Sequence, residues 1–96
     1  MPKGYFIGEV DITNPDGYEG YRARVVPTVE KYGGRFLTRG GDPKLIEGEI
    51  EAKRIVILEF DSPERALAWY HSPEYQAILP IRQANSTARA HVLTGI

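Results

Sequence analysis

The chain of 96 residues is 42% hydrophobic and 26% charged, a composition typical of one folded domain, which we expect to span residues 1–96. Its 12 Lys and Arg residues are mixed along the chain with 13 Asp and Glu residues, so no basic surface for nucleic acid is expected. Cysteine is absent, which excludes disulfides and thiolate metal sites. With no signal peptide or long apolar run either, we expect a cytoplasmic protein that does not enter the membrane.

The first expected element is a strand at residues 5–12, where the side chains follow a period of two. A helix follows, in which Asn14 or Asp16 can accept the first free N–H groups, and a glycine pair after it permits the left-handed backbone that ends a helix. Pro27 lies inside this helix, lacks an N–H and crowds the preceding turn, so we expect a kink or a split just before it.

Two further strands are predicted in the middle of the chain. Residues 35–39 form a short strand that the Gly-Gly-Asp-Pro segment at residues 40–43 ends, and the loop after it is expected to contain a brief extended piece at residues 45–46. Residues 53–60 are the clearest strand and are apolar at both parities. This pattern indicates a central strand that is covered on both faces.

The last third of the chain predicts two short helical segments and a final strand. Residues 61–64 combine a capping side chain with a proline in the first turn, which is typical of a helix start. A second helix starts the same way at residues 72–74, and Pro80 is expected to kink it. Residues 88–93 are expected to close the chain as the fourth strand.

The order of these elements predicts an α+β fold of the ferredoxin-like βαββαβ kind, with a four-stranded antiparallel sheet whose middle strands are the first and third. Two helices then cover one face of the sheet. The strand at residues 53–60 is nevertheless apolar on both faces, so another surface has to cover the second one. We expect this cover to be a second copy of the chain, which gives a homodimer with a barrel made of two sheets.

Four segments carry a resemblance to the domain of unknown function family 1330, within the dimeric α/β-barrel superfamily. These segments are residues 26–41, 47–48, 54–60 and 69–76. The resemblance implies a ferredoxin-like protomer and a homodimer but no activity, because the family is uncharacterised. Relatives in the superfamily include cofactor-free monooxygenases of quinol-like aromatics, haem-degrading enzymes, muconolactone-type isomerases and ligand sensors. They share no single catalytic motif, so the resemblance assigns no site residue here.

Three carboxylates are candidates for proton transfer. Glu59 shares a strand parity with two isoleucines, and Glu9 and Asp11 share one parity of the first strand, so the three can converge on the second face of the sheet. Converging carboxylates would have raised pKa values and could shuttle protons. The alternative is that they are solvated at strand ends or paired with Arg39 or Arg54.

His71 is the other candidate catalytic group. It follows Trp69 and Tyr70 at the expected end of a helix, where the helix dipole favours a charged imidazole. It is a candidate base or haem ligand, and the alternative is a surface or capping residue. His91 is the only other histidine, and its spacing from His71 predicts no metal site.

A ligand site can also be built from tyrosines and one arginine. Tyrosines at helical spacing either line the core or stack on an aromatic ligand, and Tyr70 and Tyr75 are the candidates for the second role. Arg39 ends a strand beside a glycine pair, where a guanidinium can hold a carboxylate or phosphate. The alternative for Arg39 is that it braces the loop or the rim of a dimer.

Two hypotheses of function follow. The first is a cofactor-independent oxygenase or isomerase acting on a small aromatic or carboxylate-bearing molecule, which Arg39 orients, His71 or Glu59 deprotonates and Tyr70 and Tyr75 contact. It predicts a pocket between sheet and helices and requires neither metal nor cofactor. The alternative is a non-catalytic ligand-binding or structural dimer, with a filled interior and no perturbed titrating pair.

Overall fold

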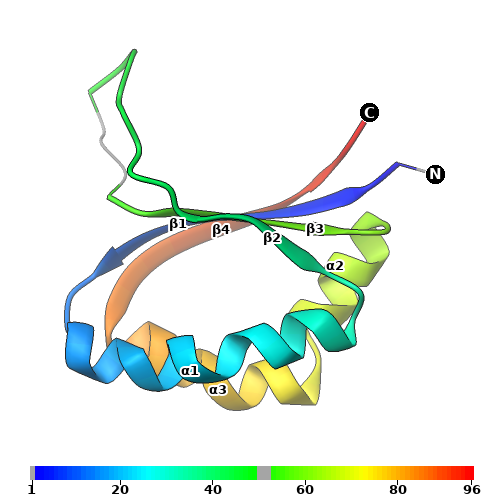
Figure 1. Ribbon diagram of the computed structural model, residues 1–96, viewed down its shortest axis with the longest axis horizontal. Coiled ribbons are helices and arrows are strands. Elements are labelled where there is room, and N and C mark those ends of the chain that lie inside the picture. Colours follow the sequence, from blue (N-terminus) through cyan, green and yellow to red (C-terminus); the bar gives the residue numbers. More distant parts are fainter. Residues whose placement is uncertain (1, 50–52) are drawn as a thin grey trace.

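The computed structural model describes residues 2–49 and 53–96. Its four strands form one antiparallel sheet in the order β2-β3-β1-β4, and its helices all lie on one face of that sheet (Figure 1). This confirms the predicted ferredoxin-like fold with the first and third strands in the middle. The elements are β1 (Gly4–Ile12), α1 (Pro15–Lys31), β2 (Arg35–Gly40), β3 (Ile55–Phe60), α2 (Pro63–Tyr70), α3 (Pro73–Ala84) and β4 (Ser86–Thr94).

Serine caps start the two short helices as the sequence predicts. Ser62 and Ser72 each accept the backbone N–H three residues further on, at 3.2 and 3.1 Å, and a proline follows each serine. The first helix begins where the sequence predicts, but without the expected cap: the Asn14 side chain accepts no N–H of α1, and its amide instead donates to Asn85 at 3.0 Å. This hydrogen bond joins the start of α1 to the connection between α3 and β4.

The prolines inside helices do not divide them. α1 is one helix through Pro27, so the split that the sequence suggested does not occur, and α3 likewise continues through Pro80. Near Pro27, the guanidinium of Arg39 donates to the carbonyl oxygen of Arg22 at 3.2 Å and so contacts the backbone of α1 from the edge strand. The extended piece expected at residues 45–46 is not a strand in the structure.

The core lies between the helices and the sheet and is rich in aromatic rings. Trp69 and Tyr75 are completely buried, and Trp69 donates its indole N–H to Thr28 Oγ1 at 3.0 Å. The hydroxyls of Tyr21 and Tyr75 lie 2.8 Å apart and form a hydrogen bond. These polar tips find partners inside the core, so the tyrosines of α1 and α3 mainly fill it.

The second face of the sheet has no helix over it (Figure 1). Ile7 of β1 lies opposite Ile57 of β3 and His91 of β4, and Ile55 lies opposite Glu9. Ile55 and Ile57 are only partly buried by their own chain. The open face is therefore apolar at its centre, as the pattern of residues 53–60 predicted.

A bulge in β2 shifts the register of this edge strand. Phe36 lies opposite Leu58, but Thr38 lies opposite the next residue, Ile57, so Leu37 is the extra residue. Each later side chain of β2 therefore changes face. Arg39 pairs with Val56 on the helix side of the sheet, where an unbroken alternation would have placed it on the open face.

Candidate functional site

Two hollows lie between the helices and the sheet, and both are lined by Phe6 and Arg82. We call the larger one the outer groove; it has a volume of about 880 Å³ and lies between α2, α3 and β4. We call the smaller one the inner cavity; it has a volume of about 30 Å³ and lies between α1 and the sheet. Only the outer groove has the volume of an ordinary small-molecule site.

The outer groove exists because the sheet carries small side chains beneath it. On the helix side of β4 stand Ala88 and Ala90, and both line the groove. These residues leave the space under α2 and α3 unfilled. Tyr70 and Leu67 of α2 and Val92 of β4 form the apolar part of the groove.

Arg82 is the buried charge of the site. Its side chain comes from the last turn of α3, the residue is only 8% exposed, and its Nε is buried without a hydrogen-bond partner. Within residues 2–49 and 53–96, no carboxylate forms an ion pair with Arg82. A buried charge without a counter-ion is costly, so this guanidinium is suited to an anion that enters from outside.

The charge states around Arg82 are set by burial and by the neighbouring phenols. Burial disfavours the charged guanidinium, but the phenols of Tyr75, Tyr21 and Tyr70 together outweigh this effect and the pKa of Arg82 is raised. Burial also raises the pKa of Tyr75 and of Tyr21. The site thus combines a permanent cation with neutral phenols.

Other polar residues surround the mouth of the groove. His71 directly follows α2, and His91 and Arg89 come from β4. Arg89 is already paired with Glu9. No Asp or Glu is among the described residues that line the groove, so Arg82 dominates its electrostatics.

The predicted site residues do not come together in one place. Tyr70 and His71 line the outer groove, whereas Arg39 lines the inner cavity. Tyr75 is in the core behind both and lines neither. Glu59 lies on the open face of the sheet, across from the helices.

The sequence reasoning missed Arg82. An arginine in the last turn of a helix is usually explained by the helix dipole, so its position at the helix end does not by itself signal a buried charge. The one available signal was that α3 carries apolar residues at Ile78 and Leu79, which puts Arg82 on the same buried side of the helix.

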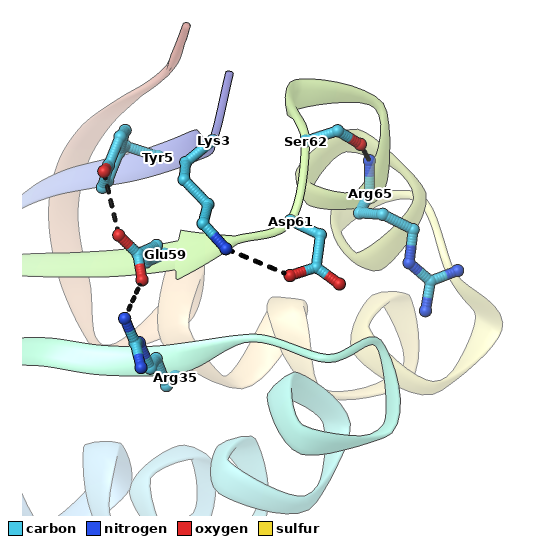
Figure 2. Close-up of polar contacts among 7 residues, drawn as sticks. All are labelled: Lys3, Tyr5, Arg35, Glu59, Asp61, Ser62 and Arg65. Atoms are coloured by element: carbon cyan, nitrogen blue, oxygen red, sulfur yellow. Dashed lines mark hydrogen bonds and ion pairs between the residues drawn. The ribbon is translucent and has the colours of Figure 1, made fainter. Parts of the chain in front are cut away.

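The predicted convergence of carboxylates was wrong. Figure 2 shows Glu59 held by two partners: the Tyr5 hydroxyl donates to Oε2 at 2.9 Å, and Arg35 forms an ion pair with Oε1. The Tyr5 hydrogen bond and Arg35 hold the pKa of Glu59 below its ordinary value. Glu9 lies opposite Ile55, well along the strands from Glu59, and pairs with Arg89 instead.

This network predicts a pH dependence of stability. Because the pKa of Glu59 is lowered in the folded protein, its contribution to stability is present above the ordinary value of 4.5 and is lost as the pH falls through the folded value. As the pH falls below about 4.5, we expect the free energy of unfolding to decrease less in Glu59→Gln than in the parent. Urea unfolding at a series of pH values measures this difference. Parallel curves for the two proteins would contradict the prediction.

The fold and the open sheet face define a protein of the dimeric α/β-barrel class. Within it, the chain belongs to the family described as domain of unknown function DUF1330, whose family model matches residues 3–96. No curated protein matches the chain. None of the helices in the described parts of the chain is long and apolar enough to cross a membrane.

Solved structures with the same fold are distant in sequence. A protein of unknown function from Rhodopseudomonas palustris, RPA0582, is 18% identical, with a TM-score of 0.81 over 99% of this chain and 83% of its own. SnoaB, a cofactor-independent oxygenase from Streptomyces nogalater, is 14% identical, with a TM-score of 0.67 over 100% of this chain and 95% of its own. A proposed antibiotic biosynthesis monooxygenase from Nitrosomonas europaea is 12% identical, with a TM-score of 0.57 over 98% and 90%. At these identities the likeness shows the fold alone, and proteins of this fold typically form dimers.

Proposed function

We propose that the outer groove binds a small organic anion that has a carboxylate group and an aromatic or other apolar body. The observation that carries the proposal is Arg82, a buried guanidinium that no carboxylate of the described chain neutralises. A carboxylate matches a guanidinium in charge and in planar geometry.

The walls of the groove support the apolar part of this ligand. Phe6, Leu67 and Tyr70 offer ring faces and aliphatic carbon, and the volume of about 880 Å³ accommodates a ring with substituents. In this arrangement Arg82 binds the carboxylate and Tyr70 packs against the ring. His71, at the mouth, forms a polar contact with the ligand or moves a proton.

Thermal unfolding in the presence of matched compounds tests the proposal. We expect benzoate-type acids to raise the melting temperature with a saturating concentration dependence, because a ligand of the folded state stabilises it by mass action. The corresponding neutral amides should have little effect. The shift should weaken in His71→Ala and persist in Arg24→Gln, whose arginine is exposed on α1. Equal shifts with acids and amides, or none with either, would refute the anion site.

A second candidate function is a cofactor-independent oxygenase acting on a small aromatic in the same groove. It is favoured by the full-length likeness to SnoaB, which is such an oxygenase, and by the aromatic walls beside a permanent cation that can stabilise a phenolate. Oxygen uptake with a panel of simple quinols tests it. The candidate predicts uptake above the rate without protein, and an unchanged rate for every quinol would exclude it.

We also propose that the chain, as one domain, forms a homodimer through the open face of the sheet. The support is the apolar centre formed by Ile7, Ile55 and Ile57, which the chain's own helices leave uncovered. A twofold axis can pair this face with the same face of a second copy. Each copy then covers the apolar centre of the other, and no additional surface is needed.

A further inference from the structure

The inner cavity brings a second unpartnered arginine together with Arg82. Among the described residues, just two buried side-chain nitrogen or oxygen atoms have no hydrogen-bond partner: Nε of Arg54 and Nε of Arg82. Both arginines line the inner cavity. Buried donors are almost always satisfied in native proteins, so two orphans at one cavity indicate that an acceptor belongs there.

The charge around the cavity has the same sign throughout. Arg22 and Arg39 also line it, and no Asp or Glu is among its described lining residues. Arg22 is paired with Glu19 at 3.2 Å, whereas Arg39 donates to a backbone carbonyl and lies over the Phe36 ring. Arg39, Arg54 and Arg82 are therefore left without a carboxylate partner within the described parts of the chain.

The size of the cavity limits what the acceptor can be. A volume of about 30 Å³ holds about two water molecules or one anion of a few atoms, and it is too small for an aromatic ring. The rest of the lining is largely apolar, with Val25, Val56 and Trp69 among the residues, and low local polarity strengthens the attraction of an anion to the guanidinium groups.

We infer that the inner cavity is a second binding site, which holds a small planar oxyanion of the formate, bicarbonate or nitrate type between Arg54 and Arg82. A planar oxyanion presents oxygen acceptors to guanidinium groups in the geometry that they prefer. The inference shares Arg82 with the proposed function and so rests in part on it, but Arg54 lines the inner cavity and not the outer groove, which lets the two sites be tested separately.

Calorimetric titration with sodium formate tests the inference, with ionic strength held constant by sodium sulfate, whose tetrahedral anion is larger. We expect saturable binding to the parent protein and at least tenfold weaker binding to Arg54→Gln. Arg24→Gln, which removes an exposed arginine of α1, should bind as the parent does. If Arg54→Gln does not fold, Arg54→Lys provides the same comparison, since it keeps the charge and lacks Nε.

The inference would be overturned by an absence of saturable formate binding, or by equal affinities of the parent and the Arg54 variants for formate. The cavity would then hold water only. The result is separable from the proposed function, because binding of an aromatic acid in the outer groove should survive Arg54→Gln. Loss of both ligands in that variant at an unchanged melting temperature would also contradict the assignment of two distinct sites.

Discussion

Replacing Arg82 by methionine is expected to raise the free energy of unfolding by about 1–3 kcal/mol, because it removes a buried Nε–H that has no hydrogen-bond partner and keeps the apolar stem. The same change should weaken binding of an aromatic acid in the outer groove at least tenfold, since the carboxylate loses its cation. Urea unfolding and calorimetric titration measure the two effects. A substitution that raises stability but weakens ligand binding indicates that the original residue serves binding and not folding.

The control for this prediction is Arg24→Met, which makes the same substitution on the exposed side of α1. It should change the free energy of unfolding by less than about 0.5 kcal/mol and leave binding unchanged. If Arg82→Met destabilised the protein instead, the interaction of Arg82 with the Tyr75 phenol would be a structural one. The case for a ligand at Arg82 would then fail.

Replacing Ile57 by aspartate is expected to separate the proposed homodimer into monomers. Ile57 lies at the centre of the open sheet face, opposite Ile7 and Thr38. In a twofold interface each copy brings one new carboxylate into the same apolar contact, and an unpaired charge buried there costs about 3–5 kcal/mol. That cost lowers the association constant by more than a hundredfold.

Sedimentation at micromolar concentration measures the change. The parent should sediment as twice the chain mass of 10.8 kDa, and Ile57→Asp as the single chain. Leu67→Asp is the matched control, because Leu67 is 46% exposed on α2 and belongs to the helix layer. A parent that sediments as one chain, or a variant that remains dimeric, would contradict the proposed interface.

The sequence was sufficient to predict the fold because its strongest signals are local and agree with one another. The apolar segment at residues 53–60 indicated a central strand, and β3 is indeed flanked by β1 and β2. Proline after a capping serine located the starts of α2 and α3. These features depend on neighbouring residues, which a sequence displays directly.

The site was harder to predict because it depends on the register of the strands and on the space that small side chains leave unfilled. The single extra residue Leu37 moves Arg39 from the open face to the inner cavity, and no sequence pattern at β2 announces that bulge. The outer groove exists because Ala88 and Ala90 leave space between β4 and the helices, and this space cannot be recognised in the sequence until the pairing of β1 with β4 is known.

The carboxylate prediction failed for a related reason. Glu59 and Glu9 do point to the same face of the sheet, as strand parity requires, but the antiparallel register sets Glu59 opposite Tyr5 and Glu9 opposite Ile55. Parity gives the face of a side chain, whereas register gives its neighbours. By contrast, His71 and Tyr70 fall together at the groove because they are adjacent at the end of α2.

The central claim, that Arg82 binds the anionic group of a ligand in the outer groove, is tested most directly by its own Nε–H signal in a nitrogen-15 NMR spectrum. The signal is assigned by its absence in Arg82→Met and is followed during titration with the acid that gives the largest rise in melting temperature. We predict that it moves and saturates at the same concentration as the thermal effect, while the Arg24 signal stays fixed. An acid that binds and leaves the Arg82 signal unmoved would contradict the claim.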